Sequence, residues 1–306
     1  MISIIIRTLN EQKYLPDCLK AIEKQITNHK IEVIIVDSGS TDSTLNIAKK
    51  FNCKITHIAM ADFSFGKSLN LGCKCSVGEI LIFLSAHCIP TNEYWLEKLI
   101  APLISHQAVY TYGRQIARES VSKISEGKVF SKYYPPNSSI PQVGFFCNNA
   151  NAALLRTVWK KNEFNESVTG LEDMELARRL VKHGYQIAYV ADSIVEHIHE
   201  ETWYAVRKRF EREAIALRQI DSSLTIDVVD MIWLILFSII KDIGSLRSRL
   251  FLYKFSEIIF YRANQYYGSY LGGRIVRRKV KMNKYEYFHP QLSIDPIKIK
   301  HEGLDV

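Results

Sequence analysis

The sequence lacks paired cysteines. Its 306 residues contain six cysteines, and no two of them form a C-x-x-C pair. Cys73 and Cys75 stand too close together in the chain for a normal zinc pair. We therefore expect reduced thiols in a cytosolic protein, because disulfide scaffolds belong to oxidising compartments.

The sequence also lacks a long apolar run and a leader segment. Met231–Ile240 is apolar except for Ser238, but its ten residues are too few to cross a bilayer, which needs about 20. Ile2–Ile6 follows Met1 with no charged segment and no small-residue cleavage site. This start predicts a first strand and not a signal peptide.

Most of the chain lacks an excess of positive charge. The excess is concentrated in the C-terminal segment. Residues 241–306 hold 13 Lys and Arg against 6 Asp and Glu, whereas the other 240 residues hold 27 against 26. A basic segment of this kind suits nucleic acid or anionic lipid. The segment carries no recognisable nucleic-acid motif and is rich in apolar residues, so we expect no nucleic-acid partner.

One short apolar run organises the rest of the chain. Ile80–Leu84 follows a glycine and a glutamate and has no polar residue, which is typical of a strand buried on both faces. Ser85, Ala86 and His87 come directly after it. Because ligands of open α/β sheets bind beyond the carboxyl ends of the strands, we expect chemistry at these residues.

Strands and helices alternate around this run. Strands are expected at Ile2–Ile6, Glu32–Val36, Lys54–Ile58, Val109–Tyr112 and Gln186–Val190, with helical spacing between several of them. The alternation predicts an α/β fold with a doubly wound, mostly parallel sheet. The periodic pattern fades between residues 120 and 141, where we expect an irregular loop.

A helix is expected after Thr169. Thr169 and Glu172 match a capping box, in which the glutamate reaches back to the cap residue. This gives Glu172 a structural role and leaves Asp173, at the positive end of the helix, available for chemistry. Asn148 and Asn149 lie in an apolar context, where amides either brace a loop or face a polar ligand.

The composition changes after residue 220. Aromatic and basic side chains alternate there, as in helices that lie in a membrane interface. The alternative is a helical subdomain that packs its apolar face on the main domain. We therefore divide the chain into an enzyme domain, 1–220, and a basic, apolar, helical C-terminal region, 221–306.

Five segments, in order, resemble the motifs of the family 2 glycosyltransferases, inverting enzymes of the GT-A fold. Thr8-Leu9-Asn10-Glu11 resembles the family's T-x-N-E, and Val36–Asp42 resembles its nucleotide-binding turn, V-D-D-G-S-x-D. Leu69–Gly72 and Gly78-Glu79 precede the central strand as they do in the family. Glu172-Asp173 resembles the pair that carries the catalytic base. The resemblance covers residues 1 to about 215.

The resemblance implies roles for individual residues. It makes Asp173 the general base and places the nucleotide-sugar donor against Thr8, Glu11 and Asp37. To these we add expected donor contacts from Asn10, Lys67, Asn70, Ser85 and His87, and acceptor or support contacts from Glu172, Asn148, Asn149 and Arg209; Asp42 is left to the turn.

The sequence departs from the family pattern after the central strand. Ser85-Ala86-His87 stands where the family usually has Asp-x-Asp, whose last acid holds a divalent metal. A histidine can ligate Mn²⁺ but is a poor ligand for Mg²⁺. Two alternatives stay open: Mn²⁺ held by His87 with His197 or His199, or no metal, with cationic side chains on the phosphate. The loss of carboxylates favours the second and suits a donor with a single phosphate, such as a CMP-activated sugar acid.

The resemblance therefore implies a glycosyltransferase that moves a sugar to a glycan or lipid-linked acceptor in surface polysaccharide synthesis. We expect it in the cytoplasm, peripheral at the inner face of the cell membrane, with membrane contact through the C-terminal region. The alternative is a non-catalytic GT-A-like scaffold or partner subunit, against which the retained Glu172-Asp173 pair argues.

Overall fold

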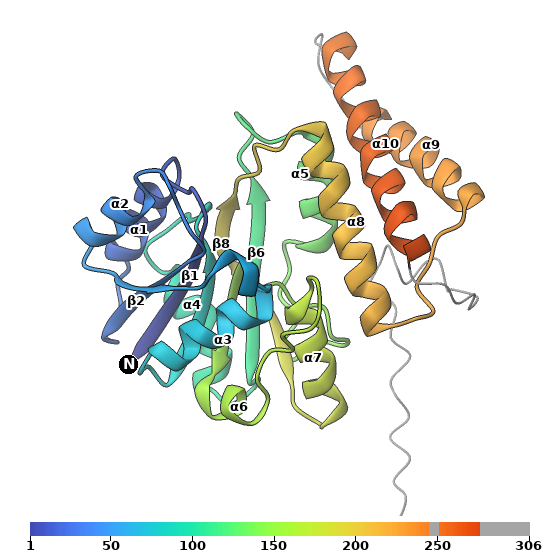
Figure 1. Cartoon of the computed structure of the whole chain (residues 1–306). Helices are drawn as coiled ribbons and strands as arrows, with labels where there is room; N and C mark the ends of the chain where they lie inside the picture. The colour runs from blue at the N-terminus through green and yellow to red at the C-terminus, as the bar shows by residue number, and fades with distance from the viewer. Residues whose placement is uncertain (245–250, 276–306) are drawn as a thin grey trace, which may run out of the picture.

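A computed structural model describes residues 1–244 and 251–275 (Figure 1). Its first half alternates strands and helices as expected: β1 Ile2–Thr8, α1 Leu15–Glu23, β2 Ile31–Asp37, α2 Thr44–Lys50, β3 Lys54–His57, α3 Phe65–Cys75, β4 Ile80–Ser85, β5 Cys88–Pro90, α4 Trp95–Ile104 and β6 Tyr110–Ala117. The second half contains α5 Ile124–Tyr133, β7 Asn151–Leu155, α6 Arg156–Lys161, α7 Glu172–Lys182, β8 Ile187–His197, α8 Trp203–Ile220, α9 Val228–Gly244 and α10 Phe251–Ile275.

The strands form one mixed sheet, in the order β3-β2-β1-β4-β7-β6-β8-β5. β1 pairs in parallel with β2 and β4, whereas β7 runs antiparallel between β4 and β6. β6 and β8 are parallel to each other. The carboxyl ends of β1, β4, β6 and β8 therefore meet at one edge of the sheet. The predicted α/β fold with a mostly parallel sheet is confirmed.

Residues of one strand alternate between the two faces of the sheet, and each face carries its own core. Ile4 and Ile82 pack with the helices α1 and α4, whereas Ile5 and Phe83 pack with α3 and α7. All four side chains are buried. Ile80–Leu84 is thus buried on both faces, as its unbroken apolar sequence predicts.

Four elements were not predicted, namely the short strand β5 and short helix α6, and also α5 and β7. α5 forms within the segment expected to be an irregular loop. It was missed because this helix has only a short apolar face, in which Phe130 is buried. β7 follows the asparagine-rich segment and was missed because Asn151, a residue uncommon in strands, opens it. β8 also continues seven residues beyond the predicted Val190, to His197.

The predicted capping box is wrong. The residue before α7 is Leu171, which has φ +53° and makes no side-chain cap, and Glu172 is the first residue of the helix. Glu172 instead accepts a hydrogen bond from Arg7 at 3.3 Å. A left-handed leucine is a strained conformation that proteins mostly keep near functional sites.

The helices α8 and α10 pack closely side by side, and α9 lies against α10 on the outside (Figure 1). The α8–α10 contact depends on two glycines, because a Cβ at Gly268 or Gly272 would collide with the carbonyl of Arg207 or Glu211. Asp242 of α9 is buried, pairs with Arg262 of α10 at 2.8 Å and accepts a hydrogen bond from Ser125 of α5.

None of the helices described here is both long enough and apolar enough to span a membrane. The division of the chain at residue 220 stays a prediction, and residues 245–250 and 276–306 of the C-terminal region lie outside the described residues.

Candidate active site

A cavity of about 790 Å³ lies at the sheet edge where β1, β4 and β8 end. Its wall contains most of the polar residues singled out in the sequence: Asn10, Glu11, Ser85, His87, Asn148, Asn149, Asp173, His197, His199 and Arg209. Residues far apart in the chain meet here because the parallel strands all deliver their carboxyl ends to this edge.

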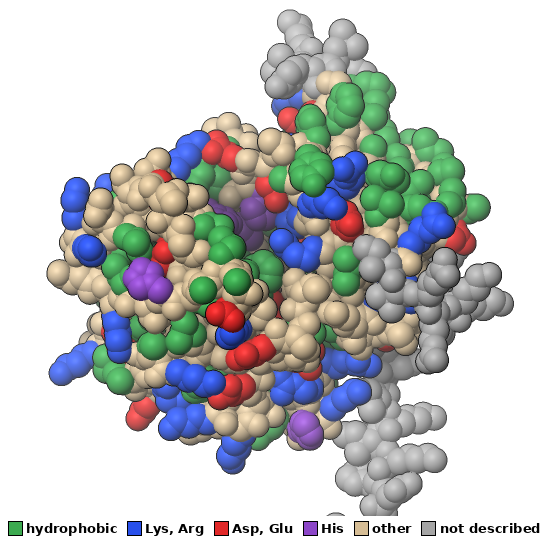
Figure 2. Space-filling model, viewed as in Figure 1, with side chains coloured by type: hydrophobic (Ala, Val, Ile, Leu, Met, Phe, Trp, Pro, Cys, Tyr) green, Lys and Arg blue, Asp and Glu red, His purple; other side chains and the backbone are tan. Residues whose placement is uncertain are grey.

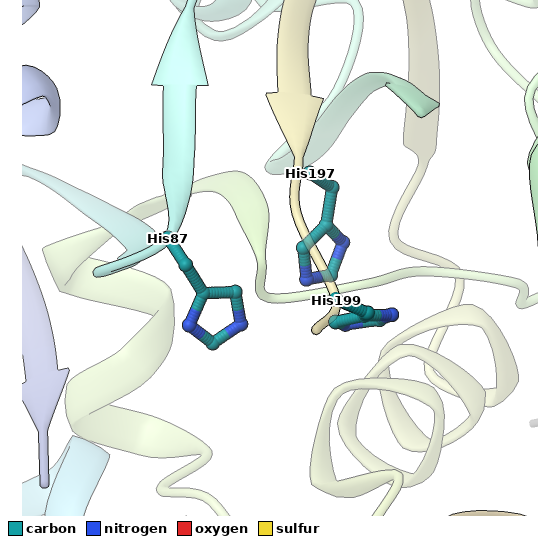
Figure 3. A group of neighbouring side chains, drawn as sticks. All are labelled: His87, His197 and His199. Carbon is teal, nitrogen blue, oxygen red and sulfur yellow. The ribbon is translucent and has the colours of Figure 1, made fainter. Parts of the chain in front are cut away.

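Three histidines meet in this cavity. His87 follows β4, while His197 ends β8 and His199 comes two residues later (Figure 3). Each offers one ring nitrogen, and these three nitrogens lie within 4.8 Å of one another. The rings of His87 and His197 stack with centroids 5.3 Å apart, and those of His197 and His199 are 4.1 Å apart. The sequence named all three as candidate metal ligands.

Each of these imidazoles is oriented by an oxygen atom at its Nδ1. His87 Nδ1 lies 3.0 Å from Glu11 Oε1, His197 Nδ1 lies 2.6 Å from Gln115 Oε1, and His199 Nδ1 lies 2.6 Å from Glu126 Oε1. With a proton on each Nδ1, every Nε2 keeps a lone pair, although that of His87 also lies in reach of the Ser85 hydroxyl. Second groups orient metal-binding histidines in this way.

The three Nε2 atoms fit a transition metal better than magnesium. Neutral imidazole suits zinc, copper, iron or nickel and can also ligate Mn²⁺, whereas Mg²⁺ prefers oxygen ligands. Ser85 Oγ, 3.1 Å from His87 Nε2, adds one oxygen at the same place. Of the two alternatives left open by the sequence, the site without metal was preferred. The three oriented imidazoles in one cavity favour the other alternative, a metal held by His87 with His197 or His199.

Arg209 acts in this cluster as a support. Its guanidinium donates to Glu126 at 2.8 Å and to Glu201 at 2.7 Å, and Glu126 in turn orients His199. Burial lowers the pKa of His199, and the charge of Arg209 lowers it further. Burial likewise lowers the pKa of His197, with His199 and His87 as further causes. Gln115 and Glu126 were missed, because nothing in the sequence shows which residues reach a histidine.

Asp173 lies in the cavity wall at the start of α7. It is 6% exposed, and its two oxygens accept the backbone N–H groups of Asn149 and Met174, each at 2.8 Å. The sequence analysis gave Asp173 no structural role, and this was wrong. Burial raises the pKa of Asp173 to about 7, and the neighbouring charge of Glu172 contributes to the rise. A carboxylate with such a pKa can exchange protons near neutral pH.

The two amides beside Asp173 brace the loop and also face the cavity. Asn149 Oδ1 accepts from Tyr110 at 2.6 Å, and Asn148 Oδ1 accepts from Gln115 at 3.0 Å. The Nδ2 group of Asn149 is buried and has no hydrogen-bond partner among the residues that the structure describes. A buried donor without a partner inside a cavity wall is suited to a bound oxygen atom.

The predicted donor residues divide into two groups. Asn10, Glu11, Ser85 and His87 line the cavity, but Thr8 and Asp37 lie behind it. Thr8 donates to Asp37 at 2.9 Å, and the turn residues Gly39 and Ser40 donate their N–H groups to the same carboxylate. Burial acts to raise the pKa of Asp37, but the hydrogen bonds led by Ser40 lower it overall. Asp42 holds the turn, as expected, by accepting from Thr44 and Gln12.

The structure does not bring Lys67 or Asn70 to the cavity. Lys67 is exposed and pairs with Asp62 at 3.2 Å. Asn70 is buried. Its Nδ2 donates to the carbonyl of Phe164, and its Oδ1 accepts from the N–H of Phe164 and, at 3.1 Å, from the indole of Trp159. Asn70 therefore holds α3 against the segment before α7.

Two cavity arginines were missed in the sequence. Arg7 lies at 4.7 Å and Arg212 at 4.9 Å from the centroid of the Phe65 ring. Phe65 and both arginines are lining residues of the cavity. Arg212 makes no hydrogen bond or ion pair within the described residues. Two guanidinium groups in one cavity wall make it suitable for an anion such as a phosphate.

Comparison with known proteins identifies the family. The family model for glycosyl transferase family 2 matches residues 3–162, and that for glycosyl transferase family group 2 matches residues 86–264. The chain belongs to the family 2 glycosyltransferases. It is therefore a transferase, and its cavity is that of a glycosyltransferase.

Two relatives of this glycosyltransferase come from Salmonella. The O-antigen chain rhamnosyltransferase RfbN of Salmonella typhimurium is 28% identical over 222 residues, which cover 69% of each chain. The O-antigen chain rhamnosyltransferase WbaN of Salmonella anatum is 30% identical over 204 residues, which cover 63% of each chain. The match to WbaN thus spans less than two thirds of that relative.

A solved structure supports the fold. The mannosyltransferase PcManGT from Pyrobaculum calidifontis, in complex with GDP-Man and Mn²⁺, matches with a TM-score of 0.61. The match covers 90% of this chain and 86% of that one, at 17% sequence identity. This likeness is one of fold and includes the helical C-terminal part.

Proposed function

We propose that this glycosyltransferase transfers a sugar, with inversion, from a nucleotide-sugar donor to a hydroxyl of a glycan or lipid-linked acceptor. The product is part of a surface polysaccharide. The observation that carries the proposal is Asp173, a buried carboxylate in the cavity wall whose pKa is raised to about 7. The two Salmonella relatives are named as O-antigen rhamnosyltransferases, so nucleotide-activated rhamnose is a donor to test first.

Asp173 acts as the general base. Its carboxylate takes the proton of the acceptor hydroxyl while that oxygen attacks the anomeric carbon. The new bond joins the acceptor oxygen to this carbon, and the bond to the nucleotide phosphate breaks on the opposite face. The hydrogen bonds from Asn149 and Met174 hold the carboxylate in place during this step.

Arg7 and Arg212 bind the donor phosphate. Their guanidinium groups flank Phe65 in the cavity wall, and guanidinium binds phosphate oxygens with two parallel hydrogen bonds. Positive charge at this place stabilises the leaving nucleotide as its negative charge grows.

We also propose a divalent transition metal, Mn²⁺ in the first instance, on His87, His197 and His199. When bound, such a metal neutralises charge on the donor phosphate. Glu11, Gln115 and Glu126 orient the three imidazoles through Nδ1, which leaves Nε2 of each as the nitrogen that would hold it.

We place the enzyme in the cytoplasm, peripheral at the inner face of the cell membrane, where a lipid-linked acceptor would be found. The free state of all six cysteines agrees with a reducing compartment.

A donor panel tests the proposed transfer. Nucleotide release is measured for nucleotide-activated rhamnose and other nucleotide sugars, with and without a lipid-linked glycan acceptor. We expect one donor to release its nucleotide at least tenfold faster with acceptor than without. A tenfold change in rate corresponds to about 1.4 kcal/mol in the activation free energy, which is the size of a single catalytic contact. A chain that binds nucleotides but transfers no sugar from any donor would instead be a non-catalytic scaffold.

A further inference from the structure

Helix α9 exposes a stripe of large apolar side chains. Val229, Ile232, Trp233, Leu236, Phe237 and Ile240 are each at least half exposed, from 50% to 74%. They recur at intervals of three and four residues, which places them on one face of the helix. Trp233 and Phe237 stack with ring centroids 4.9 Å apart. Figure 2 shows hydrophobic side chains gathered over the C-terminal helices, with Lys and Arg side chains beside them.

Packing among the described residues does not explain this face. The opposite side of α9 already makes the internal contacts, through Met231, Leu234 and Ile235 against Tyr266. Ser238 bonds to Tyr266 at 2.7 Å, and Asp242 pairs with Arg262. The alternative drawn from the sequence, a subdomain that buries its apolar face on the main domain, therefore applies to the inner side only.

The shape and length of α9 suit a membrane interface. The helix has 17 residues and one outward apolar face, whereas a spanning helix needs about 20 apolar residues on all sides. A helix with a single apolar face lies in the plane of the interface, and its tryptophan and phenylalanine sit at the headgroup level.

The charges of a neighbouring helix groove and the composition of the C-terminal region suit anionic lipid. A surface groove between α8 and α10 contains Arg207, Lys208 and Arg274 and only one acid, Glu211. In the sequence, residues 241–306 carry 13 Lys and Arg against 6 Asp and Glu. Each basic residue near an anionic surface strengthens the attraction.

We propose that the exposed face of α9 is a membrane-docking surface for anionic phospholipid. This surface would account for the peripheral location proposed above. The proposal rests on the proposed function only for the purpose of docking, which is to bring the cavity to a lipid-linked acceptor. A second copy of the chain fits the surface less well, because it would bring two basic C-terminal regions together.

Vesicle flotation tests the docking surface. The full chain is mixed, without donor or acceptor, with vesicles of phosphatidylcholine alone or with roughly one third phosphatidylglycerol, an anionic lipid. The test variant is the double substitution Leu236→Glu and Ile240→Glu. Its control is Val77→Glu with Val143→Glu, which places the same charges at exposed valines outside α9 and outside the cavity. Both variants should melt close to the wild type, because all four side chains are exposed.

We expect the wild type and the control to float with the anionic vesicles. The α9 variant should bind them at least about tenfold more weakly, because two apolar contacts are replaced by repelled charges. High salt and neutral vesicles should each weaken binding of the wild type. Wild-type protein that stays in solution with anionic vesicles, or an α9 variant that binds like the wild type, overturns the proposal.

Light scattering of the same proteins without vesicles tests whether a second copy of the chain occupies this face instead of a membrane. A dimer that the α9 substitutions convert to a monomer would assign this face to a second copy and would also overturn the proposal. Nucleotide release is measured separately, so failure of docking leaves the proposed transfer standing, and failure of transfer leaves docking standing.

Discussion

Replacement of Asp173 by asparagine should change how stability depends on pH. Burial, with the charge of Glu172 as a second cause, raises the pKa of Asp173 from 3.8 to about 7. The folded chain therefore keeps this proton between about pH 4 and pH 7, whereas the unfolded chain releases it. Consequently, the free energy of unfolding falls as the pH rises through this window and is constant above it. Asparagine carries no charge at any of these pH values and removes this dependence.

The magnitude follows from the size of the shift. One pH unit inside the window is worth about 1.4 kcal/mol, so a change from pH 5 to pH 8 costs the wild type about 2–3 kcal/mol at this residue. For a chain of this size that is about 5 °C in melting temperature. The lost acceptor oxygen of Asp173→Asn weakens a hydrogen bond, but this offset is the same at both pH values.

Differential scanning fluorimetry at the two pH values gives the comparison. The melting temperature of Asp173→Asn minus that of the wild type should be about 5 °C higher at pH 8 than at pH 5. Glu175→Gln is the matched control, because Glu175 lies on the same helix outside the cavity and pairs with Arg179. A difference for Asp173→Asn that does not change with pH would refute the raised pKa.

Three further substitutions test other parts of the site. His87→Ala should weaken binding of Co²⁺, followed by its visible absorption, by more than the roughly 10–100-fold typical of a lost outer-shell partner; unchanged binding would remove His87 from the metal site. Arg212→Gln should raise the donor KM by about tenfold, the order expected for one charged hydrogen bond, with a melting temperature like that of the wild type; an unchanged KM would contradict a phosphate contact. Asn70→Ala should destabilise the fold by about 2–4 kcal/mol in urea unfolding, because it leaves buried partners unsatisfied, while donor affinity stays the same; a loss of affinity without a loss of stability would return Asn70 to the donor site.

The fold could be predicted from the sequence wherever strands are buried on both faces. Ile80–Leu84 has no polar residue, and Ile2–Ile6 has only Ser3, so little competes with the buried-strand interpretation. β7 and α5 could not be predicted in this way. Asn151 is stabilised by its tertiary partner Trp95, which donates to its side chain at 2.9 Å, and no local pattern shows that contact.

The site was predicted in its residue types and less well in their roles. Ser85, His87, Asp173, His197 and His199 could be named as candidates because each lies at or just after the end of a strand, or in the first turn of a helix, at the same sheet edge. Glu172 was misassigned because Thr169 and Glu172 match a capping box. In the structure the left-handed Leu171 precedes the helix, and Glu172 is its first residue. Arg7 and Arg212 were missed because their meeting at Phe65 joins β1, α3 and α8 and has no signature in the sequence.

The most direct test of the central claim is a single-turnover measurement on Asp173→Asn with the donor that the panel identifies. The account predicts that this variant binds the donor as the wild type does, since the proposed role of Asp173 is toward the acceptor hydroxyl and not the donor. Its rate of sugar transfer should fall by roughly 10²–10⁴-fold, as for a lost general base. A transfer rate close to that of the wild type, with the donor bound normally, would contradict the assignment of Asp173 as the catalytic base.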